Sequence, residues 1–344
     1  MNNAHQRGGG YLRIYAIKKI YQKLGLNVVE LFQDNFTRKI TVRSILDSFY
    51  YGLRTAIMFR PIHQEIPNGD IYHLDNLRQF SWIKASALKH KFIIYNAHNL
   101  EFENYFGRRR GIFANRFTRF EVKQMEKASL IFVCSNREKE IVVKLNKNLE
   151  NKIFVLPNLV EKNNYYHKTE KNVIAFIGSL SYFPNIQAIE YLCGDFINKI
   201  PDHVKDKCKF VIAGRGPLDG QAIKVQQAGF KFFSDLSDEK IRELYASTKI
   251  LLVPLESGSG TRLKIIEAIF SGAKVISTPL GAEGIESQVI TISNISDFHK
   301  AFLDCLEERH DNNRVHIDEF SKKYDIEEWF KDNELQLSSR INQF

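Results

Sequence analysis

The chain has 344 residues, of which 44% are hydrophobic, and it carries a formal net charge of +9. This length and apolar content are sufficient for two domains, each with its own core. No apolar run approaches the roughly eighteen residues that a membrane span needs, and the beginning of the chain lacks a signal-peptide pattern. We therefore expect a cytoplasmic protein of two domains.

The cysteines do not indicate a disulfide framework or a zinc site. They are scattered, without a CxxC pair or a histidine at ligand spacing. The four positions are Cys134, Cys193, Cys208 and Cys305. We expect reduced, buried thiols.

Positive charge is concentrated in the first half of the chain. Residues 1–165 have a net charge of +13, whereas residues 166–344 have a net charge of −4. Clustered lysine and arginine could contact nucleic acid, anionic lipid headgroups or a phosphate-bearing acceptor. A solvated, lysine-rich surface is the alternative that needs no ligand. Charge alone does not choose among them.

Short apolar runs alternate with stretches of helical period along the whole chain. In the first half, strands are predicted at 27–32, 91–96 and 130–135, and helices at about 10–24, 112–128 and 137–148. In the second half, strands are predicted at 173–178, 209–214, 230–233, 250–254 and 274–278, each followed by a helix. This alternation predicts repeated βα units around parallel sheets.

A polar stretch without apolar periodicity separates the two halves. We expect an N-terminal Rossmann-like domain at 1–158, a linker at 159–172 and a C-terminal Rossmann-like domain at 173–322. We expect the remaining 323–344 to form a helix that packs back on the N-terminal domain. Two facing, doubly wound domains would bind a ligand at the carboxyl ends of their strands.

The most informative segment is 250–284, ILLVPLESGSGTRLKIIEAIFSGAKVISTPLGAEG. Its strand ends at Pro254, and Gly258 and Gly260 permit unusual backbone dihedral angles before a helix that is predicted to begin near Thr261. The amides of residues 259–262 would then point outward at a helix N-terminus, where phosphate binds.

Arg262 and Lys264 place two cations in the first turn of this helix. The helix macrodipole makes each unfavourable there by about 0.3–1 kcal/mol. An anionic ligand would remove that conflict.

Glu267 lies two turns into the same helix, in an otherwise apolar stretch. A carboxylate in such a place needs a partner. The two hydroxyls of a ribose would supply one. The alternative is a glutamate that caps a neighbouring loop or pairs with a lysine.

This segment resembles the donor-binding signature of retaining glycosyltransferase family 4, in the subset whose loop reads GSGTRLK. Further similar blocks are FIGSLSYFPN, FVIAGRGP, FFSDLSDEKIRELYASTKILLVPL, NAHNLEFENYF, KASLIFVCSNRE and VLPNLV. The resemblance implies the α/β GT-B fold, with two facing Rossmann-like domains built on doubly wound parallel sheets. It also implies sugar transfer with retention of anomeric configuration.

The resemblance assigns roles to individual residues. Glu267 matches the glutamate that holds the donor ribose, and His98 matches a histidine near the sugar and the reacting centre. Residues matched to the donor diphosphate are Gly258, Ser259, Gly260, Thr261, Arg262 and Lys264. Ser259 departs from the family, which has a glutamate there. A histidine on a loop after a strand could also be merely structural.

The N-terminal glycines match a further family element. Gly8, Gly9 and Gly10 resemble the loop that follows the first strand and lies near the acceptor and the donor phosphates. Only seven residues precede Gly8, and MNNAHQR does not read as a buried strand. We therefore expect this chain to lack the first strand of its N-terminal domain.

Several other signals are weak. The segment 213–220 imitates a dinucleotide fingerprint but misses its spacing, and no GxxxxGK phosphate loop is present. No DxD pair is present either, so we expect neither a metal nor a cofactor. Arg262, Lys264 and the helix terminus can neutralise the leaving group instead.

The densest basic patch is GRRRG at 107–111 with Arg116, Arg119 and Lys123, interleaved with phenylalanines. As an amphipathic helix, it could lie on anionic lipid at the inner face of the cytoplasmic membrane, where a lipid-linked acceptor would be found. More often, such spacing gives one buried aromatic stripe and one wet face. No nucleic-acid motif accompanies the charge, so nucleic acid is not expected as a partner.

We expect a hexosyltransferase that moves a sugar from a nucleotide-diphosphate sugar to a hydroxyl of a saccharide or lipid-linked acceptor. The expected setting is bacterial surface polysaccharide, lipopolysaccharide or glycolipid synthesis. Two alternatives are a nucleotide-sugar epimerase or hydrolase on the same fold, and an inactive donor-binding subunit.

Overall fold

The computed structural model describes residues 9–29, 69–75, 77, 89–106, 111–168, 171–216, 222–285, 287–307 and 314–342. The chain forms two compact units. The larger unit comprises Met1–Ala16 and Asn158–Asp332, and the smaller unit comprises Ile17–Pro157 and Asn333–Phe344.

The larger unit is built on a six-stranded parallel sheet of order β10-β9-β8-β5-β6-β7. Its strands are β5 (Val173–Ile177), β6 (Lys209–Gly214), β7 (Lys231–Ser234), β8 (Thr248–Val253), β9 (Lys274–Ser277) and β10 (Ile290–Ile292). The central β5 pairs with strands on both sides, so that Ile174 lies opposite Phe210 of β6 and Ile250 of β8. All five strands predicted for this half are present.

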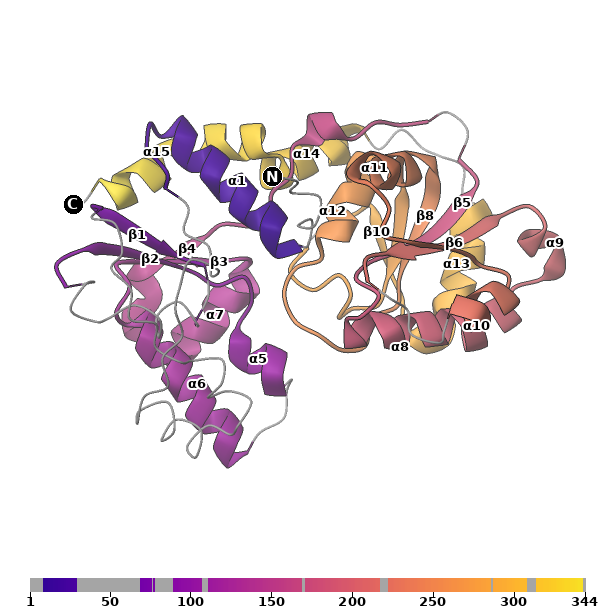
Figure 1. Ribbon diagram of the computed structural model, residues 1–344, viewed down its shortest axis with the longest axis horizontal. Coiled ribbons are helices and arrows are strands. Elements are labelled where there is room, and N and C mark those ends of the chain that lie inside the picture. Colours follow the sequence, from indigo (N-terminus) through magenta and orange to yellow (C-terminus); the bar gives the residue numbers. More distant parts are fainter. Residues whose placement is uncertain are drawn as a thin grey trace. The chain divides into compact units, whose positions relative to one another are not determined.

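The helices of the larger unit cover both faces of its sheet. They are η3 (Lys162–Asn164), α8 (Phe183–Tyr191), η4 (Leu192–Phe196), α9 (Asp202–Lys205), α10 (Ala222–Gln227), α11 (Asp238–Ser247), α12 (Leu263–Phe270), η5 (Ile295–Asp297), α13 (Phe298–Glu307) and α14 (Arg314–Tyr324). Helices α8 and α10 lie on one face, and α11 and α12 lie on the other (Figure 1). Because the chain leaves the neighbouring strands β5 and β8 toward opposite faces, a topological switch point lies between their carboxyl ends.

The smaller unit is built on a four-stranded parallel sheet of order β1-β2-β3-β4. Its strands are β1 (Ile71–Leu74), β2 (Phe92–Asn96), β3 (Leu130–Val133) and β4 (Ile153–Val155). Its helices α5 (Glu101–Phe106), α6 (Ile112–Met125) and α7 (Asn136–Leu145) cover one face of this sheet, and η2 (Lys147–Lys152) leads into β4 (Figure 1). A strand was predicted at 27–32. Residues 27–29 form neither a helix nor a strand, and residues 30–32 lie outside the described residues.

Helix α1 (Gly9–Lys23) corrects one expectation about the N-terminal glycines. Gly9 and Gly10 form its first turn instead of a loop, and Gly8, like the expected missing strand, lies outside the described residues. The helix extends this far back because Arg13, Ala16 and Ile17 are buried at helical spacing.

The segment expected as a linker is packed into the larger unit over its described part. Val160 forms a parallel bridge with Asp325, and its amide donates to the Tyr324 carbonyl at 3.0 Å. The Lys162 amide donates to Asp325 Oδ2 at 2.8 Å. Hydrogen bonds of the backbone hold this segment in place. It therefore does not need a periodic pattern of apolar side chains, and its composition can be polar.

Helix α15 (Ile326–Ile341) is divided between the units by its contacts, with Asn333 onward belonging to the smaller one. Within the smaller unit, Arg340 Nη1 donates to the Asn151 carbonyl.

No helix of the described ranges has both the length and the apolar character needed to cross a membrane. The four cysteines are unpaired thiols; Cys134 and Cys305 are buried, whereas Cys193 and Cys208 are partly exposed.

Gly214, the last residue of β6, packs closely against Gly178, which follows β5. A Cβ at this position would lie 1.6 Å from the Gly178 carbonyl oxygen. We expect Gly214→Ala to lower the free energy of unfolding by about 1–3 kcal/mol or more in urea titrations, because backbone must move. The control is Gly194→Ala, where a Cβ meets nothing within 4 Å. Equal stability of the two variants would contradict the close approach.

Candidate functional site

Lys264 lies at the switch point and connects the two strand ends. Its Nζ donates to Asn185 Oδ1, at the start of α8, at 3.1 Å. The same Nζ lies 4.4 Å from the ring centroid of Phe176 in β5. The ammonium therefore contacts the β5 side, although it belongs to the helix that follows β8.

The loop between β8 and α12 depends on glycine. Gly258 and Gly260 have φ angles of 100° and 81°, the left-handed region that favours glycine. The sequence predicted unusual dihedral angles at both. Helix α12 begins at Leu263, two residues later than predicted, because Arg262 keeps an extended backbone with φ −95° and ψ 96°.

Arg262 is buried in this loop, with an exposed fraction of 9%. Its Nη1 donates to the carbonyls of Ser259 and Gly260. Its Nε and Nη2, like the Ser259 hydroxyl, are buried without a hydrogen-bond partner in the described part of the chain. Each buried unsatisfied donor costs about 1–3 kcal/mol. The loop therefore contains several unsatisfied donors, whose cost a ligand rich in acceptors would remove on binding them.

Within the described ranges, no carboxylate forms an ion pair with Arg262 or Lys264. Burial, together with the neighbouring Arg262, lowers the pKa of Lys264 to about 7, against the opposing effect of Glu267. Burial also lowers the pKa of Arg262. A bound anion would relieve both effects.

The Glu267 carboxylate is held by two phenols. Tyr165 donates to Oε1 at 2.8 Å, and Tyr245 donates to Oε2 at 3.1 Å. Burial and the adjacent Glu267 raise the pKa of Tyr245 well above its usual value, so this phenol remains a donor. Each carboxylate oxygen can accept a second hydrogen bond. Sequence reasoning did not identify either tyrosine.

A second support of the loop comes from Asn158. Its Nδ2 donates to Thr261 Oγ1 at 2.5 Å and to the Thr261 carbonyl at 3.3 Å. Its Oδ1 accepts from Arg13 Nη1 at 3.2 Å. Arg13 and Asn158 are both buried. The only sequence signal for this support was an asparagine between apolar residues in VLPNLV.

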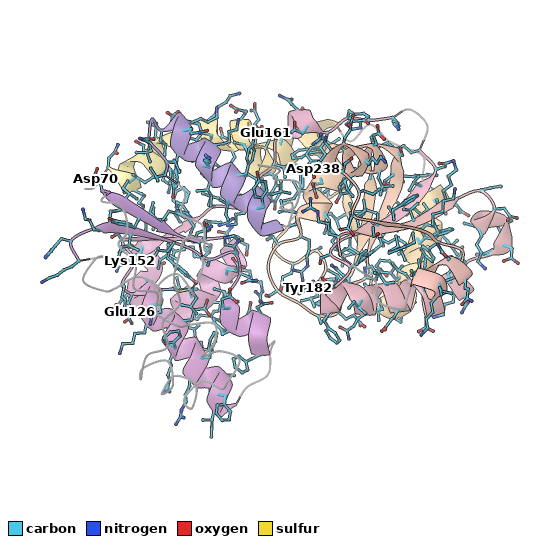
Figure 2. The ribbon with its side chains drawn as sticks, viewed as in Figure 1. Asp70, Glu126, Lys152, Glu161, Tyr182 and Asp238 are labelled. Atoms are coloured by element: carbon cyan, nitrogen blue, oxygen red, sulfur yellow. The ribbon has the colours of Figure 1, made fainter. Side chains whose placement is uncertain are left out.

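Gly258 also makes room for its neighbours from the loop after β5. A Cβ there would lie 2.9 Å from Tyr182 Oη and 3.2 Å from Arg262 Nη2. Tyr182, which is labelled in Figure 2, precedes α8 and is 39% exposed. Glycine at 258 therefore allows the guanidinium and the phenol to lie on the same side of the loop.

His98 belongs to a polar cluster in the smaller unit, at the carboxyl ends of β1 and β2. Asp75 Oδ1 lies 3.0 Å from His73 Nε2 and 3.4 Å from His98 Nε2, and accepts from Asn96 Nδ2 at 2.9 Å. Burial raises the pKa of Asp75, but the two histidines outweigh this effect and hold the pKa well below its usual range. The hydroxyl of Tyr21 lies 2.6 Å from His73 Nδ1.

Asp75 and His73 were not predicted as site residues from the sequence. Their signal is an HxD pair at the end of β1, a strand that the apolar pattern did not predict. The other candidates divide between the units: Gly9, Gly10 and the residues from Gly258 to Glu267 belong to the larger unit, and His98 belongs to the smaller one.

Solved structures match the chain over most of its length and identify its fold as GT-B. HepE from Anabaena, in complex with UDP and glucose, matches with a TM-score of 0.63 at 14% identity, covering 97% of each chain. Sucrose-phosphate synthase from Thermosynechococcus elongatus matches with a TM-score of 0.60 at 13% identity, covering 80% of this chain and 73% of that one. At such identities, the likeness establishes the fold.

A protein-family model matches most of the larger unit. Residues 171–308 match the family described as Glycosyl transferases group 1. This stretch runs from β5 through α13 and contains the whole loop around Arg262 and Lys264. A search of curated proteins found no match to the sequence.

The unusual environment of Lys264 can be tested by NMR titration of lysine side chains with isotopic labels. We expect one ammonium to titrate near pH 7, and its signal to be absent from Lys264→Met. Adding inorganic pyrophosphate should raise this midpoint, because a bound anion favours the charged form. A Lys264 midpoint at the ordinary lysine value would contradict the burial of this ammonium.

Proposed function

We propose that the protein is a glycosyltransferase that moves a sugar from a nucleoside-diphosphate sugar to a hydroxyl acceptor. The observation that carries this proposal is the buried guanidinium of Arg262, with two nitrogens lacking partners in the described part of the chain, beside the ammonium of Lys264. The match of residues 171–308 to the group 1 family supports it. So do the UDP and glucose bound by HepE, a protein of the same fold.

In this proposal, the larger unit binds the donor. Arg262, Lys264 and the Ser259 hydroxyl bind the diphosphate, together with the amides at the start of α12. Glycines 258 and 260 let the phosphates approach the backbone. Glu267 accepts hydrogen bonds from the two ribose hydroxyls.

The chemistry of this proposal depends on the leaving group. As the bond to the sugar breaks, negative charge develops on the diphosphate, and Arg262 and Lys264 stabilise it. We propose on the family 4 resemblance that the sugar retains its anomeric configuration and that the reaction needs no metal. A phosphate oxygen would take the proton of the acceptor hydroxyl. His98 would contact the sugar and would not act as a nucleophile.

We further propose a saccharide or lipid-linked acceptor in bacterial surface polysaccharide or glycolipid synthesis, and a peripheral contact with the cytoplasmic membrane. The first turn of α6 supports the membrane contact. Ile112 and Phe113 are 71% and 60% exposed there, next to the exposed Arg116 and Arg119. Phe117 of the same helix is buried, as the alternative of a buried aromatic stripe expects.

Vesicle sedimentation tests this membrane contact. We expect the protein to bind vesicles that contain phosphatidylglycerol, and replacing Ile112 and Phe113 by serine to weaken binding by about 10-fold or more, because apolar area no longer enters the bilayer. Ile223→Ser is the matched control, since Ile223 is 65% exposed on α10 of the larger unit. Equal binding by all three proteins would refute the role of α6.

Calorimetry with UDP and UMP tests the donor site. We expect Glu267→Gln to weaken both nucleotides about equally, by roughly 10- to 100-fold, because the ribose is common to them. Lys264→Met and Arg262→Gln should weaken UDP much more than UMP, because UMP lacks the second phosphate. Glu243→Gln, an exposed position on the adjacent α11, is the control.

Two results would count against the proposal. Unchanged UDP affinity in Glu267→Gln would refute the ribose role, and equal losses for UDP and UMP in Lys264→Met would refute the diphosphate role. Thermal unfolding of each variant shows whether the fold is intact, because the buried Tyr245 hydroxyl needs an acceptor at position 267.

A further inference from the structure

The polar cluster around Asp75 draws its members from several segments of the smaller unit. Tyr21 comes from α1, His73 from β1 and Asn96 from the end of β2. His98 follows β2, and Asp75 is the common partner of the two histidines and the asparagine. Asn96 and His98, which lie 21 and 23 positions after Asp75 in the sequence, thus contact the same carboxylate oxygen of Asp75.

The hydrogen bonds of this cluster have a fixed direction. Asp75 is ionised at neutral pH, because its pKa is held well below the usual range, and an ionised carboxylate only accepts. The Nε2 atoms of His73 and His98 must therefore carry the hydrogens in their contacts with Oδ1. In neutral His73, Nδ1 is then an acceptor, and the Tyr21 hydroxyl donates to it at 2.6 Å.

His98 is held from two sides. Its ring contacts Asp75, and its backbone carbonyl accepts from the Cys134 thiol at 3.2 Å. Its side chain retains an exposed fraction of 23%. Among the described residues, none donates a hydrogen bond to Nδ1 of His98. One edge of the ring is thus bound to the protein, and the acceptor nitrogen is left for a ligand.

We propose that Asp75 is a positioning residue that holds neutral His98 as the Nε2–H tautomer, so that its Nδ1 accepts a hydrogen bond from a sugar hydroxyl. This proposal rests on the proposed function for the identity of the ligand. It restricts the ligand group to a donor, a hydroxyl or an amide N–H. An ether oxygen or a carboxylate would face the lone pair of Nδ1 and be rejected.

Nitrogen NMR of the full-length protein with 15N-labelled histidine tests the tautomer without any substrate. His98→Asn identifies the resonances of His98. For the neutral imidazole of His98, we expect a protonated-type Nε2 signal and an unprotonated-type Nδ1 signal. Asp75→Ala should convert this pattern into a mixture of tautomers. The reverse assignment in the wild type, or an unchanged pattern in Asp75→Ala, would overturn the proposal.

Two further variants distinguish an effect of Asp75 on the His98 ring from a general effect on folding. Asp70→Asn makes a similar change at the other end of β1, where the exposed side chain of Asp70 is labelled in Figure 2, and it should leave the His98 signals unchanged. Asp75→Asn keeps the shape of the side chain and is used if Asp75→Ala does not fold. It removes the charge, and it should also shift His98 toward a mixture.

Kinetics then connect the tautomer to sugar transfer. We expect Asp75→Asn to lower kcat by up to about 100-fold, because a misoriented ring no longer places the hydroxyl. UDP affinity by calorimetry should remain as in the wild type, since the donor loop belongs to the other unit. An unchanged kcat would overturn the proposed contact with sugar. A wild-type protein that binds no nucleoside diphosphate would instead refute the proposed function, and the NMR result would stand separately.

Discussion

Two buried cations, Arg262 and Lys264, for which the described part of the chain offers no ion-paired carboxylate, are the constraint on which the larger unit depends. Removing a guanidinium and an ammonium from water costs several kcal/mol each unless a counter-charge or good hydrogen bonds compensate. Here the compensation inside the described protein is partial. Arg262 uses one nitrogen on two carbonyls, and Lys264 has one amide oxygen and an aromatic face. Such an arrangement is costly for the protein alone and favourable once an anion is bound.

Local charge and overall charge are unrelated in this molecule. Residues 166–344 are net negative, yet they contain the loop that attracts an anion. The strongly basic first half has a carboxylate, Asp75, at the centre of its polar cluster. What matters at each place is which groups are buried together, because screening by water and salt weakens the contribution of exposed charges.

Much of the larger unit could be predicted because its signals are local in the sequence. Five of its strands are apolar runs, and the residues from Gly258 to Glu267 form one continuous segment. In contrast, the short strands β1, β4 and β10 were not predicted, and the first two of them lie in the smaller unit. The early part of the smaller unit was therefore the least predictable.

The partners that support the site could not be predicted in the same way. Asn158 contacts Thr261 across 103 positions, and Tyr165 contacts Glu267 across 102 positions. Nothing in the local sequence of a tyrosine or an asparagine specifies a partner so distant, since tertiary packing brings them together. The role of Glu267 was inferred from its neighbours in the chain, whereas its phenolic partners required the fold.

The loop before α12 is already ordered by its own contacts. Arg262 holds the carbonyls of Ser259 and Gly260, and Asn158 holds Thr261. A loop in this state has little conformational entropy left to lose when a ligand arrives. Recognition of a diphosphate would consequently depend on enthalpy and on the release of water, and donors that differ only in their sugar would bind this loop with similar free energies.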